Sequence, residues 1–237
     1  MPTVIGRVLL DLVYPRRCAL CDGVLPRGQE GCCEQCALEL RYLKEPLCLK
    51  CGKPVGDREE YCHDCSQREH EFREGAALFE YGCIKASLYR YKYGGRQEYA
   101  AFYARHMAAR MKKKIELWRP QALVPVPMYP GKKRQRGYNQ AELLAKELSL
   151  LWKIPVEGGL VLRCRNTRPM KEIEGKNRQN NLKKAFKIGR NDVKLNTIVI
   201  IDDIYTTGST ADAVSRVCKA AGIRQVYVLS LAIGKGF

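Results

Sequence analysis

Eight of the 12 cysteines form four C-x2-C pairs in the first third of the chain. The pairs are Cys18 with Cys21, Cys33 with Cys36, Cys48 with Cys51, and Cys62 with Cys65. A C-x2-C turn directs two thiolates at one metal ion, and two such turns complete the closed tetrahedral ligand set of a structural Zn²⁺ site. The spacing therefore predicts two structural zinc ions. Joining sequential pairs is the simplest assignment, and an interleaved pairing also satisfies the spacing.

The string IVIIDDIYTTGSTA, residues 198–211, combines groups that suit a sugar phosphate. An apolar strand ends in the carboxylates of Asp202 and Asp203, and a loop of small residues then runs into a helix. The loop residues are Thr206, Thr207, Gly208, Ser209 and Thr210. Backbone N–H groups at a helix start suit a phosphate monoester, whereas paired carboxylates suit vicinal hydroxyls and a divalent cation. The alternative is an ordinary strand–turn–helix corner with a hydroxyl-rich cap.

A basic loop after another strand is a candidate site for a second anion. The strand at 122–127 is followed by Lys132, Lys133, Arg134 and Arg136. Guanidinium groups bind phosphate oxygens in a bidentate manner, so this loop suits a pyrophosphate group. A solvated basic loop is the alternative interpretation.

Hydrophobic patterning indicates the elements that must position these groups. Short apolar runs predict strands of a parallel sheet at 76–81, 122–127, 197–202 and 226–233. Helical patterns lie between them, at 83–93, 97–118, 139–152 and 209–222. We therefore expect an α/β fold in two parts. The first, residues 1–74, holds an N-terminal helix and a double zinc ribbon, and the second, residues 75–237, holds the mainly parallel sheet.

The charge is concentrated in the second part. The net charge of the whole chain is +17, to which residues 1–75 contribute −2 and residues 76–237 contribute +19. So basic a domain favours nucleic acid or a phosphorylated ligand over a neutral metabolite, with ordinary solubilising lysines as the alternative. Six tyrosines between positions 81 and 103 alternate with basic residues, a pattern that suits base stacking on a single strand and helical core packing equally well.

The sequence lacks the marks of a membrane or secreted protein. No apolar run is long enough to span a bilayer, and the opening residues lack a signal-peptide pattern. We therefore expect a cytoplasmic protein. In a reducing compartment, cysteines serve as metal ligands rather than in disulfides, which agrees with the zinc interpretation.

The strand, acid pair and T-T-G-S-T loop at 198–211 resemble the ribose-phosphate-binding motif of the type I phosphoribosyltransferases. The resemblance implies that Asp202 and Asp203 hold the ribose hydroxyls of phosphoribosyl pyrophosphate (PRPP). It also implies that residues 206–210 hold the 5′-phosphate, and that Mg²⁺ accompanies the substrate.

Nearly the whole chain resembles the ComF family of competence-related proteins, which joins a double zinc ribbon to a phosphoribosyltransferase-like domain. The matching stretches include LLDLVYPRRCALC, YRYKYGG, and VPVPMYP followed by KRQRGYNQAELLA. The resemblance places Arg134 and Arg136 on the pyrophosphate side of the fold. It also implies that the loop carrying Arg178 and Asn181 closes over the reaction centre.

The family resemblance implies a role in DNA uptake during natural transformation. PRPP and single-stranded DNA are then the expected ligands, and other competence proteins, such as a DNA-uptake helicase, the expected partners. One hypothesis is a Mg²⁺-dependent phosphoribosyltransferase, a glycosyltransferase whose acceptor the sequence does not identify. The other is a non-catalytic module that handles single-stranded DNA, with PRPP a regulator or a relic. Met170 and Ile173 replace the family's usual Gln and Leu, which puts any polar role of that Gln in doubt.

Overall fold

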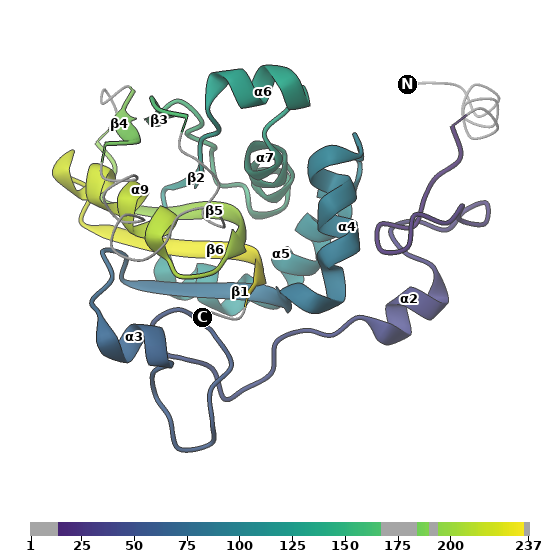
Figure 1. Ribbon diagram of the computed structural model, residues 1–237, viewed down its shortest axis with the longest axis horizontal. Helices are drawn as coiled ribbons and strands as arrows, with labels where there is room; N and C mark the ends of the chain where they lie inside the picture. The colour runs from purple at the N-terminus through teal and green to yellow at the C-terminus, as the bar shows by residue number, and fades with distance from the viewer. Residues whose placement is uncertain (1–13, 167–183, 190–193, 235–237) are drawn as a thin grey trace.

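The computed structural model describes residues 14–166, 184–189 and 194–234. Its centre is a parallel sheet of four strands in the order β1-β6-β5-β2 (Figure 1). The strands are β1 (Glu74–Glu80), β2 (Ala122–Pro125), β5 (Thr197–Tyr205) and β6 (Gln225–Ile233). Residues 198–201 are fully buried, as expected where helices cover both faces of a parallel sheet. The prediction of an α/β fold with a mainly parallel sheet is confirmed.

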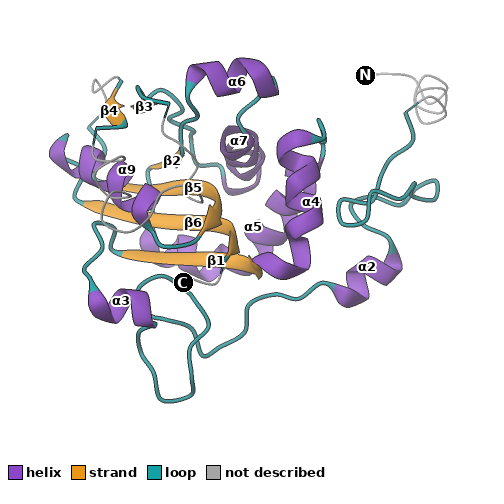
Figure 2. Cartoon of the chain, in the orientation of Figure 1, coloured by secondary structure: helices purple, strands orange, loops and turns teal. Residues whose placement is uncertain are grey.

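Helices cover both faces of the sheet (Figure 2). On one face lie α4 (Tyr81–Tyr93), α5 (Tyr99–Trp118) and α7 (Gln140–Trp152), and on the other lie α9 (Ser209–Ala220) and the antiparallel pair β3 (Val161–Arg163) and β4 (Phe186–Ile188). Because side chains alternate along a strand, Val199 and Ile201 join the first core while Ile198 and Ile200 join the second. Among the described residues, no helix is long and apolar enough to cross a membrane.

The connections that follow β2 and β5 leave the sheet toward opposite faces. β2 leads to α6 (Pro130–Arg136) and then to α7, whereas β5 leads to α9. Neighbouring strands with diverging connections leave a crevice at their carboxyl ends, where α/β proteins bind ligands. The register between β2 and β5 ends with Pro125 opposite Ile201, so the crevice opens directly beyond these residues.

The cysteine-rich segment, with the short helices α2 (Glu34–Glu39) and α3 (His63–Gln67), packs against strand β1. The backbone N–H of Leu43 donates to the carbonyl of Leu78 over 3.1 Å, and the N–H of Gly75 donates to the carbonyl of Lys50 over 2.7 Å. β1 is an edge strand of the sheet: it pairs with β6, and Phe79 also forms an isolated antiparallel bridge with Tyr42 of the cysteine-rich segment. The segment therefore satisfies part of an edge that would otherwise be open.

Two predicted boundaries are wrong. The basic stretch after β2 is the helix α6 rather than a loop, because Pro130 suits its first turn and Gly137 ends it with a φ of 87°. Strand β5 runs to Tyr205 rather than ending at Asp202, because residues 202–205 continue to pair with β6.

Candidate functional site

The eight paired cysteines gather into two clusters. One cluster holds Cys18, Cys21, Cys33 and Cys36, and the other holds Cys48, Cys51, Cys62 and Cys65. Within each cluster the Sγ atoms lie within 4.8 Å of one another, which fits a tetrahedron with Zn–S bonds of about 2.3 Å. Sequential pairs share each site, and the interleaved pairing is excluded. Four thiolates leave no open coordination position, so zinc in these sites is structural.

Backbone N–H groups stabilise the first thiolate of each cluster. The Sγ atom of Cys18 accepts from the N–H groups of Leu20, Cys21 and Cys33 over 3.4, 3.5 and 3.4 Å. Burial alone would raise the pKa of Cys18, but these donors outweigh burial and lower the pKa to about 7. The pKa of Cys48 falls to about 7 by the same balance. Each cluster therefore has one thiol that ionises near neutral pH, whereas burial and neighbouring cysteines raise the pKa of Cys36, Cys51 and Cys62, so that zinc binding would displace their protons.

The acid pair lies at the crevice. Asp202 and Asp203 follow the last residue of β5 that pairs with β2, and as neighbours in a strand they leave opposite faces of it. The Asp203 carboxylate lies 3.0 Å from the ammonium group of Lys92 and accepts a hydrogen bond from the side-chain amide of Gln140. The Asp202 carboxylate accepts the backbone N–H of Asp203 over 2.8 Å.

The surroundings of Asp202 oppose its negative charge. Burial and the neighbouring Asp203 carboxylate raise the pKa of Asp202 to about 7, although Lys92 and Arg163 act in the opposite direction. A carboxylate in such surroundings gains stability from an added cation or hydroxyl donor, so perturbed acids of this kind mark candidate ligand sites. The hard carboxylate oxygens of the pair fit Mg²⁺.

The loop after β5 turns on Gly208. Its φ is 73°, and a Cβ atom there would lie 2.5 Å from Tyr205 Oη and 2.8 Å from His70 Cε1, so only glycine fits. Helix α9 begins at Ser209, whose hydroxyl lies 3.0 Å from Thr207 Oγ1. The first turn of a helix has N–H groups without intrahelical partners, which an anion can accept. The hydroxyls beside them belong to Thr206, Thr207, Ser209 and Thr210.

The two arginines predicted on the pyrophosphate side point to different places. Arg134 lines a hollow of about 530 Å³ between α6 and β3, together with Arg163. The guanidinium of Arg136 lies 4.6 Å from the centre of the Tyr93 ring and donates a hydrogen bond to the side chain of Gln140. Arg134 therefore faces the hollow, whereas Arg136 contacts Gln140, which in turn donates to Asp203.

The sequence analysis did not single out Lys92 and Gln140, which both contact Asp203. Gln140 accepts from Arg136 and donates to Asp203, so it orients the carboxylate between two basic side chains. Both residues lie in stretches that carry the family resemblance, YRYKYGG and KRQRGYNQAELLA. Gln140 is a polar residue at the first position of a helix. That position was the signal in the sequence that could have identified it as a site residue.

The polar segment 163–185, predicted to close over the site, connects β3 to β4. At its base the guanidinium of Arg163 lies 5.4 Å from the centre of the Phe186 ring. The predicted loop residues Arg178 and Asn181, and the substituted positions Met170 and Ile173, lie outside the described residues.

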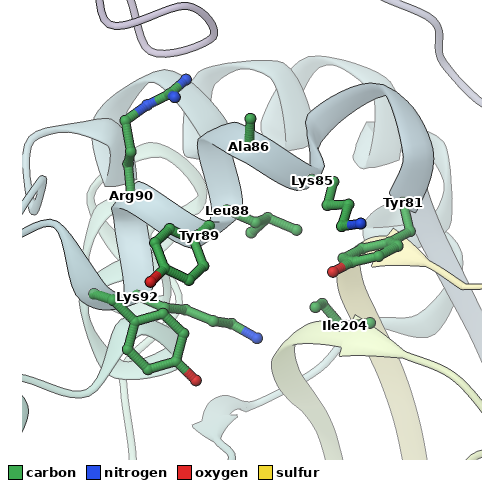
Figure 3. Close-up of a pocket in the computed structure, with 9 residues that line it drawn as sticks. Tyr81, Lys85, Ala86, Leu88, Tyr89, Arg90, Lys92 and Ile204 are labelled. Atoms are coloured by element: carbon green, nitrogen blue, oxygen red, sulfur yellow. The ribbon is translucent and has the colours of Figure 1, made fainter.

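A second hollow, of about 610 Å³, runs along α4 and reaches β5 at Ile204 (Figure 3). The side chains of Tyr81, Lys85 and Lys92 surround it, and Ile204 of β5 faces them. Lys92 joins this hollow to the crevice through its ion pair with Asp203.

The clustered tyrosines divide between the core and the surface. Tyr91, Tyr99 and Tyr103 are at most 1% exposed, and they belong to the core between α4, α5 and the sheet. Tyr89 and Tyr93 are 65% and 64% exposed, with ring centres 5.1 Å apart. Core packing therefore explains the three buried tyrosines, whereas the exposed pair and the partly buried Tyr81, which also lines the hollow along α4, are available for stacking with a ligand.

Comparisons with known proteins agree with the two-part architecture. Residues 9–66 match the double zinc ribbon domain. The chain is 29% identical to Competence protein F of Haemophilus influenzae, over 91% of this chain and 96% of that protein. It is 28% identical to DNA utilization protein YhgH of Escherichia coli, over 93% and 98% of the two chains. Competence protein ComFC of Bacillus subtilis is 26% identical, over 84% of this chain and 87% of that one.

Among solved structures, a purine phosphoribosyltransferase from Pyrococcus horikoshii is similar with a TM-score of 0.34 and 16% identity. The similarity covers 56% of this chain and 73% of that chain. The prediction of a zinc-ribbon module at the N-terminal end is confirmed by the family match and by the two cysteine clusters.

Proposed function

We propose that this chain, which is similar over most of its length to Competence protein F and Competence protein ComFC, binds PRPP with Mg²⁺ in the crevice between β2 and β5 and acts in DNA uptake during natural transformation. The observation that carries the PRPP proposal is the acid pair followed directly by the Gly208 turn and the start of α9. The competence role rests on the names of the relatives. Related proteins named for DNA utilization support the same general role.

The crevice offers a group for each part of PRPP. Asp202 and Asp203 are placed to accept hydrogen bonds from the ribose hydroxyls, and the N–H groups and hydroxyls at 206–210 suit the 5′-phosphate. The hollow lined by Arg134 and Arg163 suits the pyrophosphate, because it adds positive charge at the carboxyl end of β2. Acceptors, hydrogen-bond donors and positive charge on the protein thus match the ribose, the 5′-phosphate and the pyrophosphate of the substrate.

Transfer of the phosphoribosyl group breaks the bond between ribose C1 and the pyrophosphate oxygen and forms a bond from C1 to the acceptor. Positive charge develops on the ribose ring, where the carboxylates of Asp202 and Asp203 stabilise it, and negative charge develops on the pyrophosphate, where Arg134 stabilises it. Mg²⁺ held by the carboxylates and the substrate would neutralise further charge on the leaving group. Catalysis then comes from positioning and electrostatics, without a covalent nucleophile.

Isothermal titration of PRPP with Mg²⁺ tests the proposed site. Each charge-assisted hydrogen bond contributes about 1.5–3 kcal/mol, so Asp202→Asn with Asp203→Asn should weaken binding by at least about 100-fold. Asp57→Asn with Glu60→Gln is the matched control, since it removes two exposed charges from the zinc-ribbon module. Wild-type affinity in the acid-pair variant would refute the assignment.

A pyrophosphate-release assay then separates the two functional hypotheses. Release of pyrophosphate on addition of free bases or DNA indicates a transferase and identifies the acceptor class. Tight PRPP binding without release, under any of these conditions, supports a non-catalytic role for PRPP.

A second candidate function is the binding of single-stranded DNA, favoured by the hollow along α4. The exposed rings of Tyr89 and Tyr93 lie beside Lys85 and Lys92, the arrangement with which proteins stack bases and neutralise phosphates without sequence preference. The excess positive charge of residues 76–237 adds a long-range attraction for polyanions.

Fluorescence anisotropy with a labelled oligonucleotide tests this second function. Tyr89→Leu with Tyr93→Leu should weaken binding by about 1–3 kcal/mol for each stacked base, while Tyr61→Leu, an exposed tyrosine of the zinc-ribbon module, should leave binding unchanged. Binding should also fall steeply with salt. Absence of binding at low salt would remove this function.

A further inference from the structure

His70 lies in the segment that joins the second cysteine cluster to β1, and its side chain is completely buried beneath the loop after β5. Its Nδ1 atom is 2.9 Å from a carboxylate oxygen of Asp212, and its Nε2 atom is 3.5 Å from the hydroxyl of Tyr205. A Cβ atom on Gly208 would lie 2.8 Å from the imidazole. The ring therefore supports the turn that begins α9.

Asp212 fastens the first turn of α9 to this same segment. One carboxylate oxygen accepts the backbone N–H of Glu71 over 2.9 Å while the other contacts His70. One turn further along α9, Arg216 donates to the Glu71 carboxylate over 3.0 Å. A buried polar contact of this kind fixes one arrangement, because breaking it leaves both partners unsatisfied.

The other face of His70 contacts the surroundings of the second cysteine cluster. The imidazole stacks on Phe72 with ring centres 4.8 Å apart. Phe72 is 1% exposed and belongs to one buried group with Cys48, Cys51 and Cys62. A continuous series of packed contacts thus runs from the second cluster through Phe72 and His70 to Gly208.

The first cysteine cluster contacts other elements and provides an internal comparison. It packs instead on α4 and α5, where the carbonyl of Ala19 accepts from Ser87 and that of Leu20 accepts from Arg90. Any effect that passes through His70 should therefore reach the second cluster and not the first.

We propose that His70 is a positioning residue that shapes the loop at 206–210 for a phosphate monoester and couples this loop to zinc in the second cluster. The inference rests on the proposed function, since it takes the loop to be a phosphate site. Coupling between two sites is reciprocal: if zinc in the second cluster favours phosphate binding, bound phosphate must raise the zinc affinity of that cluster by the same factor.

Equilibrium competition for zinc between the full chain and a chromophoric chelator tests the coupling. Saturating PRPP with Mg²⁺ should raise the zinc affinity of the second cluster at least about fivefold and leave the first cluster unchanged. Cys21→Ser disables the first cluster and so identifies the signal of the second. Should that variant not fold, ¹¹³Cd spectra of the cadmium-loaded wild-type chain give a separate resonance for each cluster, and only one should respond to PRPP.

Substitutions of His70 separate positioning from general destabilisation. His70→Leu fills the space of the imidazole with an apolar side chain but removes the hydrogen bond to Asp212. It should abolish the effect of PRPP on the zinc affinity of the second cluster. His70→Asn places an amide N–H near the position of Nδ1 and should restore part of the effect. His63→Leu, on the exposed side of α3, is the control and should behave as wild type.

The outcomes separate this inference from the proposed function. If PRPP binds the wild-type chain but zinc affinity does not change, the coupling is refuted and the PRPP site stands. An undiminished effect in His70→Leu would refute the role of His70. If neither PRPP nor inorganic phosphate binds the wild-type chain, both proposals fall together.

Discussion

Asp202 should make the protein less stable as the pH rises from about 5 to about 8, the reverse of an ordinary paired carboxylate. Burial and Asp203 raise its pKa from an ordinary 3.8 to about 7. The native state therefore binds this proton more tightly than the unfolded chain does. The stabilising contribution is fully present below pH 3.8 and is lost as the pH rises through about 7.

The magnitude follows from the two pKa values. Integrating proton binding between about pH 5 and about pH 8 gives a loss of roughly 3 kcal/mol in the free energy of unfolding. Solvent reaches part of the Asp202 side chain, so this figure is an upper value. Asn in place of Asp202 cannot ionise and should remove this component of the pH dependence.

Urea unfolding of the wild-type chain and of Asp202→Asn at both pH values measures the effect. Asp202→Asn should be the more stable protein at pH 8, and its advantage over the wild-type chain should shrink by up to roughly 3 kcal/mol at pH 5. Asp57→Asn, an exposed carboxylate, controls for the loss of charge. An identical pH dependence in Asp202→Asn and wild type would refute the reasoning. Saturating Mg²⁺ with PRPP should remove the stability advantage of Asp202→Asn over the wild-type chain at pH 8, since a bound cation favours the ionised carboxylate.

Three further experiments, using five substitutions, have expected outcomes. Gly208→Ala should lower the free energy of unfolding by about 1–3 kcal/mol and weaken PRPP binding, as measured by urea unfolding and titration. Gly95→Ala is the control, at a similar φ of 72° but with open space around it. It should lower the free energy of unfolding by less and leave PRPP binding intact. Cys48→Ser should lose one of two zinc equivalents by elemental analysis, and retention of both would contradict the ligand assignment. Tyr91→Leu should destabilise the fold by a few kcal/mol in urea unfolding, while Tyr89→Leu should change stability by less than about 0.5 kcal/mol; equal effects would contradict the observed burial.

Patterns that repeat locally were enough to predict much of this architecture. The C-x2-C pairs predicted both clusters because ligand geometry requires that spacing, and apolar runs predicted the four strands of the parallel sheet. Of the two predictions that failed, helix α6 has local signals in Pro130 and Gly137, whereas the end of β5 depends on a distant partner. Strand β5 extends past Asp202 because β6 offers pairing there, and neither Asp202 nor its neighbours signal this in the sequence.

Other features have no sequence pattern that reveals them. The segment 66–75 is charged and lacks apolar periodicity, yet it contains the buried residues His70 and Phe72. Their burial depends on contacts with α9 and the second cluster, which only the folded chain brings together. Similarly, the contact of Lys92 with Asp203 joins α4 to β5 across more than a hundred residues of chain.

Strand β6 is the last strand of the sheet to be synthesised. It nevertheless lies in the interior of the sheet, between β1 and β5. Glu74 pairs with Tyr227, so β1 must wait for a partner from the far end of the nascent chain. Contacts so distant in sequence form slowly. Until they form, the unpaired edges of the strands are sites of aggregation. The cysteine clusters close over short loops and can assemble around zinc early. By holding β1 through Leu43 and Lys50, the metal-binding segment is placed to act as an intramolecular chaperone for the half-made sheet.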